Sequence, residues 1–214
     1  DALRVGKKKR MRLLNQAIEI NPGYRDALAE RARLHRDLKK LDAAVTDFDN
    51  AIACDSEGDP SLHIERGKIL RELNKGDAAK QDFLDAVSLY TAAIDKDPED
   101  IQLFLGRAAA YKYAMDYASA RADYSHVIDF PQEKLRPYWP NQPKEEYTQL
   151  PVAEALWKRG QIYLLENNYT ESMNDSNRII DQIGDDTDMT RLYRSLGYGL
   201  RAVVHGSRGH KLRA

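Results

Sequence analysis

An apolar pattern with helical spacing dominates residues 25–60 and returns further along the chain. Apolar side chains recur there at steps of three and four, first around Leu28 and then around Ala44 and Phe48. This spacing places them on one face of each of two helices. Because the short segment 39–42 separates the two helices, the stretch predicts a helical hairpin whose apolar faces pack against each other.

The hairpin pattern recurs with a period close to 34 residues. One small or apolar residue near the end of each second helix marks the period; these residues are Ala17, Ala51, Ala86, Val127 and Ile179. Periods of roughly 20–50 residues are typical of repeat proteins. The last two steps are longer than the others, which predicts a lengthened helix before Val127 and an insertion before Ile179.

We expect a single repeat domain over residues 1–214. Its predicted segments are the second helix of a truncated repeat (7–22), a complete repeat (25–59), a repeat with a lengthened second helix (60–98), a third repeat (99–131), an insertion rich in proline and aromatic residues (132–151), a fourth repeat (152–184) and a capping helix (187–205). A lone helix at the end would cover the apolar core of the fourth repeat, as terminal units of such arrays do.

The charge balance argues against several classes of partner. The chain has 33 Lys and Arg residues against 34 Asp and Glu residues, and its formal net charge is -1. We therefore expect no nucleic-acid partner, because nucleic-acid-binding domains are usually strongly basic. The longest apolar runs are far shorter than the roughly 20 residues that a membrane span needs, so no span is expected.

The start of the sequence bears on its location. No apolar signal-peptide core precedes the first repeat pattern, which favours a cytoplasmic protein. The chain begins with Asp1 instead of an initiator methionine, so a leader or an upstream domain is left open.

The sequence contains no motif for catalysis or for a cofactor. The histidines at positions 35, 63, 126, 205 and 210 lack the local spacing of a metal or catalytic motif, and no glycine-rich phosphate loop is present. We therefore expect no enzyme activity, no metal site and no cofactor. The single cysteine, Cys54, cannot form an intrachain disulfide, and its place near the apolar face of a helix end predicts a buried side chain.

These spacings resemble the tetratricopeptide repeat, whose units place small and large residues at fixed positions on two helices. The residues that carry the resemblance are Ala32, Gly67, Ala108 and Gly160 on the first helices, the trios Ala44/Phe48/Ala51 and Ala79/Phe83/Ala86 on the second helices, and Asp116-Tyr117 before a second helix. The resemblance implies an all-α fold, a right-handed α-solenoid of antiparallel helix pairs wound into a superhelix.

The fourth repeat departs most from this pattern. Ser172 and Ser176 stand at the positions of a small and an aromatic residue. We expect this repeat to be the most loosely packed.

The resemblance also implies a peptide-binding groove lined by the first helices. The lining candidates are Arg33, Arg36, Lys68, Arg71, Lys112, Tyr113, Trp157 and Gln161. The set is basic in the first half of the chain and more aromatic in the second, which would suit a protein or peptide segment with an acidic end and an apolar end. The alternative is that these residues form ordinary solvated helix faces.

The insertion holds three large aromatic residues, Tyr138, Trp139 and Tyr147. They are candidates for a second contact surface, because aromatic residues on exposed loops are frequent in interfaces. The alternative is that they pack against the fourth hairpin.

One arginine recurs at the same position of each complete hairpin, as Arg31, Arg66, Arg107 and Arg159. These cations suit either a functional ladder or a structural role. The structural role is favoured, because aspartates recur on the second helices, at Asp47, Asp82 and Asp123.

We expect a non-catalytic scaffold for protein–protein interactions. The alternative is a regulatory or targeting segment of a larger enzyme or multi-domain protein. Self-association through an uncovered helix at the start of the chain is a third hypothesis.

Overall fold

The computed structural model describes residues 2–131, 134–135, 144–183 and 187–211. Within these ranges the long regular elements are all α-helices, in agreement with the predicted all-α fold. Tyr138 and Trp139 lie outside the described residues, as does the side chain of Tyr147.

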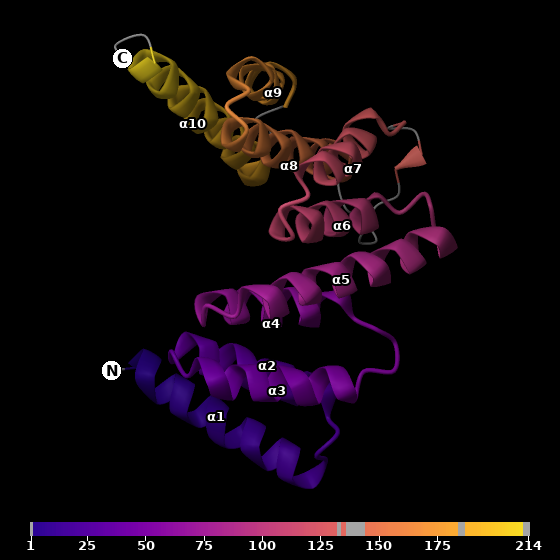
Figure 1. Cartoon of the computed structure of the whole chain (residues 1–214), viewed down its shortest axis with the longest axis vertical. Coiled ribbons are helices and arrows are strands. Elements are labelled where there is room, and N and C mark those ends of the chain that lie inside the picture. The colour runs from indigo at the N-terminus through magenta and orange to yellow at the C-terminus, as the bar shows by residue number, and fades with distance from the viewer. Residues whose placement is uncertain (1, 132–133, 136–143, 184–186, 212–214) are drawn as a thin grey trace. The chain divides into compact units, whose positions relative to one another are not determined.

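The chain divides into two compact units, residues 1–91 and 92–214, although the repeat pattern predicts one domain. The first unit contains α1 (Ala2–Ile20), α2 (Arg25–Asp37), α3 (Leu41–Ala53), α4 (Pro60–Glu72) and most of α5 (Gly76–Lys96) (Figure 1). The second unit contains the end of α5, α6 (Ile101–Tyr113), α7 (Tyr117–Asp129), α8 (Lys144–Leu165), α9 (Tyr169–Gln182) and α10 (Asp188–Lys211).

Consecutive helices pair as antiparallel hairpins, and each unit has its own apolar core. In the first unit, Leu28 and Ala32 of α2 pack with Phe48 of α3. In the second unit, Tyr124 of α7 and Leu156 of α8 are fully buried. Because each core side chain recurs at helical spacing, the hairpins follow the apolar pattern of the sequence.

Each hairpin turn contains one residue in the left-handed backbone region, two positions before the second helix. These residues are Lys39, Asn74, Met115 and Asn167, with φ between 59° and 66°. The residue that follows donates its backbone N–H to a carbonyl in the last turn of the first helix; Lys40 N to His35 O is 2.9 Å. This arrangement satisfies carbonyl groups that a helix end otherwise leaves unpaired.

α8 begins at Lys144, inside the segment 132–151 that the sequence pattern assigns to the insertion. The pattern ends the insertion at Pro151 because the helical period is absent from Pro131 to Pro151. A proline inside a helix costs roughly 3 kcal/mol. In the structure Pro151 lies within α8, and Val152, Ala153 and Leu156 are buried in the core. Burial of large apolar side chains contributes about 1.5–3 kcal/mol each, which offsets the cost of the proline.

α10 packs against both α8 and α9. Leu200 and Val204 of α10 are buried, and Gly197 lies close to α9, where an added Cβ would be 3.0 Å from Ile179 Cγ2. The sequence pattern predicts the end of this helix at residue 205, where its apolar residues stop. In the structure the helix continues to Lys211.

The prediction that Cys54 is buried is wrong, since its side chain is exposed. Cys54 follows the last residue of α3 and lies beside the buried stripe that includes Phe48 and Ala51. The next position of that stripe is Asp55, whose nearly buried carboxylate accepts a hydrogen bond from Arg25 Nη1 at 3.1 Å. The sequence pattern therefore placed Cys54 at a buried position that Asp55 occupies in the structure.

Candidate partner-binding surface

The recurring arginine makes a two-point ion pair in every complete hairpin. In α2/α3, Arg31 Nε and Nη2 donate to the two carboxylate oxygens of Asp47 at 2.8 and 2.7 Å. The same arrangement joins Arg66 to Asp82, Arg107 to Asp123 and Arg159 to Asp175. The aspartates are buried and the arginines partly buried, so the predicted structural role of the arginines is confirmed.

Sequence reasoning missed the fourth aspartate, Asp175. Its counterparts precede an aromatic residue, whereas Asp175 precedes Ser176. The constant separation of 16 residues between arginine and aspartate was the signal that would have found it. The recurring arginines thus join the two helices of each hairpin.

In the first unit, the candidate residues of α2 share one carboxylate. Arg33 Nη2 donates to Glu65 Oε1 of α4 at 2.6 Å, and Arg36 Nη1 donates to Glu65 Oε2 at 3.2 Å. Arg33 Nη1 also donates to Glu30 Oε1 at 2.7 Å. The hydrogen bonds that Arg33 donates to Glu65 outweigh partial burial and raise the pKa of Arg33, so this guanidinium is held firmly in its charged form.

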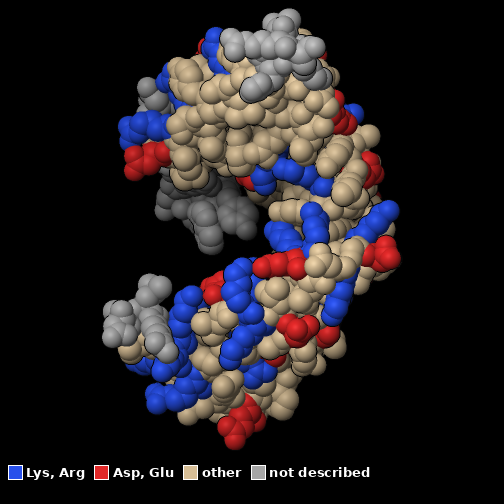
Figure 2. Space-filling view, turned by 60° about the vertical axis from the view of Figure 1, so that its left-hand side comes forward, with Lys and Arg blue, Asp and Glu red and all other residues tan. Residues whose placement is uncertain are grey.

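Lys68 and Arg71 of α4 are exposed, and the guanidinium carbon of Arg71 lies 4.8 Å from the centre of the Phe83 ring. On the visible face of the first unit, in the lower part of Figure 2, Lys and Arg side chains gather with acidic side chains between them. This visible face of the first unit therefore carries charges of both signs.

In the second unit, the structure brings together candidates from α6 and α8. Lys112 Nζ donates to Gln161 Oε1 at 2.9 Å. Partial burial lowers the pKa of Lys112, and the positive charge of Lys158 adds to that effect. Trp157 is partly buried against the core, and Tyr113 is also partly buried. These candidates thus comprise one half-buried cation hydrogen-bonded to Gln161 and two partly buried aromatic residues.

The structure brings together two candidates in each unit. Arg33 and Arg36 meet at Glu65, and Lys112 meets Gln161. Sequence reasoning missed Glu65 and Glu30, although both lie three positions before a candidate cation on their helices. Spacing along one helix does not reveal which carboxylate of a neighbouring helix a cation will bind.

No protein-family model matches the chain, and a search of curated protein sequences found no match. Among solved structures, the C-terminal part of a TPR repeat-containing protein from Cytophaga hutchinsonii is 13% identical, with 92% of this chain and 75% of that chain covered and a TM-score of 0.49. TTC0263, a thermophilic TPR protein of Thermus thermophilus, is 17% identical, with 87% and 88% covered and a TM-score of 0.48. MamA is 12% identical, with 77% and 81% covered and a TM-score of 0.46.

The hairpins of this chain have small residues at the helix crossings and one buried Arg–Asp pair between the two helices of each complete hairpin. They are tetratricopeptide-like. None of the helices in the described ranges is long and apolar enough to cross a membrane.

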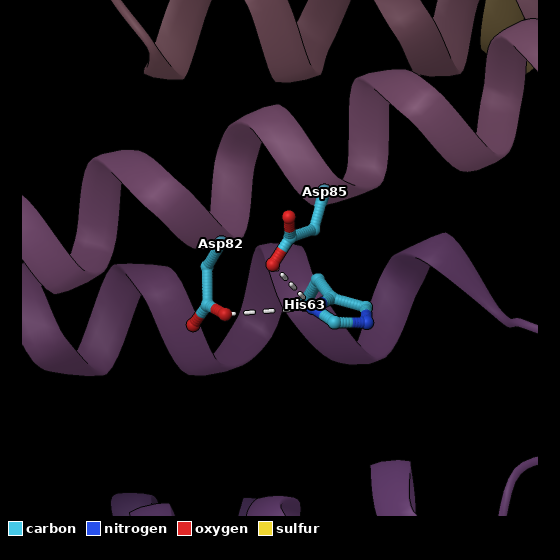
Figure 3. A group of neighbouring side chains, drawn as sticks. All are labelled: His63, Asp82 and Asp85. Carbon is cyan, nitrogen blue, oxygen red and sulfur yellow. Dashed lines mark hydrogen bonds and ion pairs between the residues drawn. The ribbon is translucent and has the colours of Figure 1, made fainter.

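The second tetratricopeptide-like hairpin also gathers three polar groups outside the candidate surface. His63 of α4 lies between Asp82 and Asp85 of α5 (Figure 3). His63 Nδ1 is 3.4 Å from Asp82 Oδ1 and 3.8 Å from Asp85 Oδ2. The ligand atoms of the three residues all lie within 4.8 Å of one another, which is a spacing suited to a metal ion. Local sequence spacing missed this group because its members come from two helices.

Proposed function

We propose that the chain is a non-catalytic scaffold that binds a protein or peptide segment along the first helices of its hairpins. One observation carries the proposal. The arginine and aspartate that recur in each hairpin pair with each other, and the aspartates are buried. The candidate residues on the first helices, which differ between hairpins, are partly or fully exposed. Repeated positions build the hairpins, and variable positions are left to recognise a partner.

The two units favour different chemistry in the bound segment. In the first unit, Arg36, Lys68 and Arg71 would attract an acidic stretch by their positive charge. The guanidinium groups of Arg36 and Arg71 can hold a carboxylate with two parallel hydrogen bonds. Such a stretch would compete with Glu65 for Arg36. In the second unit, Trp157 and Tyr113 would contact apolar side chains, and Lys112 would hold one polar or acidic group.

Affinity capture from a cell lysate followed by mass spectrometry tests this function. The bait is the full chain, and the test variant is Lys68→Glu combined with Arg71→Glu. We expect the proteins captured by the wild type to be lost or strongly reduced with this variant. Circular dichroism should show unchanged helix content in the variant.

A matched control reverses two exposed lysines of the same unit outside the candidate surface, Lys75→Glu with Lys80→Glu. Both variants carry the same net charge, so a difference between them reports position. Capture that survives in the test variant, or that falls equally in the two variants, would contradict the assignment of the surface.

A further inference from the structure

His63 occupies a position that is otherwise apolar in this repeat. The residue three positions before the recurring arginine is Leu28 in the first complete hairpin, Phe104 in the third and Leu156 in the fourth, and all three are buried. In the second hairpin the same position holds His63, whose side chain is 15% exposed. A polar ring at a core position of a single hairpin requires polar partners.

The two aspartates near His63 are each held by a second group. Gln81 Nε2 donates to Asp85 Oδ1 at 2.9 Å, which leaves Asp85 Oδ2 on the side of His63. Arg66 donates to both oxygens of Asp82, and Asp82 Oδ1 also faces His63. A carboxylate oxygen has two lone pairs, so Asp82 Oδ1 can accept from Arg66 and still bind a second group. Metal ligands in proteins are commonly oriented by such outer hydrogen bonds.

The local charge is negative. Arg66 is the cation in direct contact with the group, and it also pairs with Asp49 of α3 at 2.6 Å. Two carboxylates, on Asp49 and Asp82, contact this guanidinium, and Asp85 adds a third carboxylate beside His63, so the excess among these groups is two negative charges when His63 is neutral. A divalent cation would balance this excess.

We propose that His63 Nδ1, Asp82 Oδ1 and Asp85 Oδ2 bind a divalent transition-metal ion of the Zn²⁺ type. Zn²⁺ accepts imidazole nitrogen and carboxylate oxygen at about 2.0–2.2 Å, and tetrahedral geometry then separates neighbouring ligand atoms by roughly 3.4 Å. The distance from His63 to Asp82 already matches this value, and the distance from His63 to Asp85 exceeds it by a few tenths of an ångström.

The remaining coordination position faces solvent. The Asp85 side chain is 41% exposed, whereas Asp82 is 3% exposed. The ion therefore has an entry path on the Asp85 side and completes its coordination with water. By joining α4 to α5, it would stabilise the second hairpin.

Isothermal titration calorimetry with Zn²⁺ on the untagged full chain tests the site. The wild type should bind one ion, and His63→Gln and Asp85→Asn should each weaken binding by about tenfold or more, the order of effect expected for losing a metal-site group. Co²⁺ should give the visible absorption of a tetrahedral complex with the wild type and lose it with both variants.

Asp49→Asn is the matched control, because it removes one negative charge from the same cluster without removing a ligand. We expect it to weaken Zn²⁺ binding much less than Asp85→Asn. Equal losses in the two variants would mean non-specific attraction of cations, and the proposal would fail. It would also fail if the wild type showed no binding, or if His63→Gln bound Zn²⁺ as tightly as the wild type.

His63→Leu is a second variant that should fold normally, since leucine is the residue at this position in two of the other hairpins. It should remain helical and lose Zn²⁺ binding. In the wild type, the ring resonances of His63 should shift on Zn²⁺ addition while those of His126 stay unchanged. Unshifted His63 resonances at saturating Zn²⁺ would overturn the assignment of this ligand.

Discussion

The α4/α5 hairpin and the α8/α9 hairpin each place a glycine where the two helices approach, but different side chains lie against it. A Cβ added to Gly67 would lie 2.7 Å from Phe83 Cε1, an aromatic carbon of the same hairpin. A Cβ added to Gly160 would lie 2.5 Å from Leu200 Cδ2, which belongs to α10. In the second hairpin, the side chain at the helix crossing comes from the same hairpin. In the fourth hairpin it comes from α10, which lies outside the pair.

The two serines of the fourth hairpin fit this difference. Ser172 and Ser176 are fully buried, and Ser172 Oγ donates to Gly160 O at 2.9 Å. Ser176 stands where the other hairpins place an aromatic ring, and Leu200 lies in the space near Gly160. The fourth hairpin therefore buries both serine positions, with Leu200 of α10 beside its helix crossing. A missing aromatic ring can be replaced by an apolar side chain from a neighbouring helix.

Removing the two filling side chains should give the largest effect. Phe83→Ala should lower the free energy of unfolding by about 3–5 kcal/mol, and Leu200→Ala by about 2–4 kcal/mol, because both leave a cavity. Urea unfolding followed by circular dichroism measures both. Leu200→Ala should also make α10 sensitive to proteolysis, and an unchanged digestion pattern would contradict its role in completing the fourth hairpin.

Replacing the two glycines by alanine should change the free energy of unfolding less, and by different amounts in the two hairpins. Gly67→Ala should destabilise by about 1–3 kcal/mol, since a rigid aromatic ring must move to admit the methyl group. Gly160→Ala should change stability by less than about 1 kcal/mol, because the end of Leu200 can rotate away and alanine favours the helix. The same unfolding experiment tests this order, and a larger loss for Gly160→Ala would reverse the interpretation of the two crossings.

Asp82 and Asp175 should make the free energy of unfolding depend on pH in opposite ways, and this is the smallest of the expected effects. Burial pushes the pKa of Asp82 upward, but hydrogen bonds from His63 and Arg66 outweigh it and hold the pKa below the ordinary value. For Asp175, burial dominates over the bonds from Arg159 and raises the pKa. The contribution of Asp82 to stability is present above the unfolded pKa of about 3.9 and is lost as the pH falls through its lower folded value. The unfavourable contribution of Asp175 is present above its raised pKa and is relieved as the pH falls.

Asp82→Asn and Asp175→Asn test this contrast in urea unfolding between pH 7 and pH 3. Asp82→Asn should lose less stability on acidification than the wild type, because the contribution of the ionised carboxylate is already absent at pH 7. Asp175→Asn should lose more, because the relief that protonation of Asp175 gives the wild type is absent. Parallel curves for the two variants would show that the environments of the aspartates are alike.

The hairpins and their ion pairs were largely predictable from the sequence. Arg31 and Asp47 could be matched because both recur with the repeat, and the recurrence identifies them as part of the hairpin itself. Cys54 and Pro151 were interpreted wrongly, since each was judged from local spacing alone. The buried neighbours of Pro151 and the carboxylate of Asp55 decided those positions instead.

The candidate surface was predictable only as a set of positions. Arg33 and Arg36 were found from their register on α2, but their common partner Glu65 lies about 30 residues away on α4. Lys112 and Gln161 are 49 residues apart and meet only because α6 and α8 lie together. Register on one helix does not specify the neighbour on another.

By itself, the sequence determined the repeating unit, because the 3.6-residue period of a helix converts spacing into a buried face. It also determined the Arg–Asp pair, which lies within one hairpin and recurs. Only the tertiary structure decided that Leu200 fills the crossing at Gly160 and that His63 lies between Asp82 and Asp85. Those contacts join different helices, and their geometry depends on how the helices pack, which no local pattern encodes.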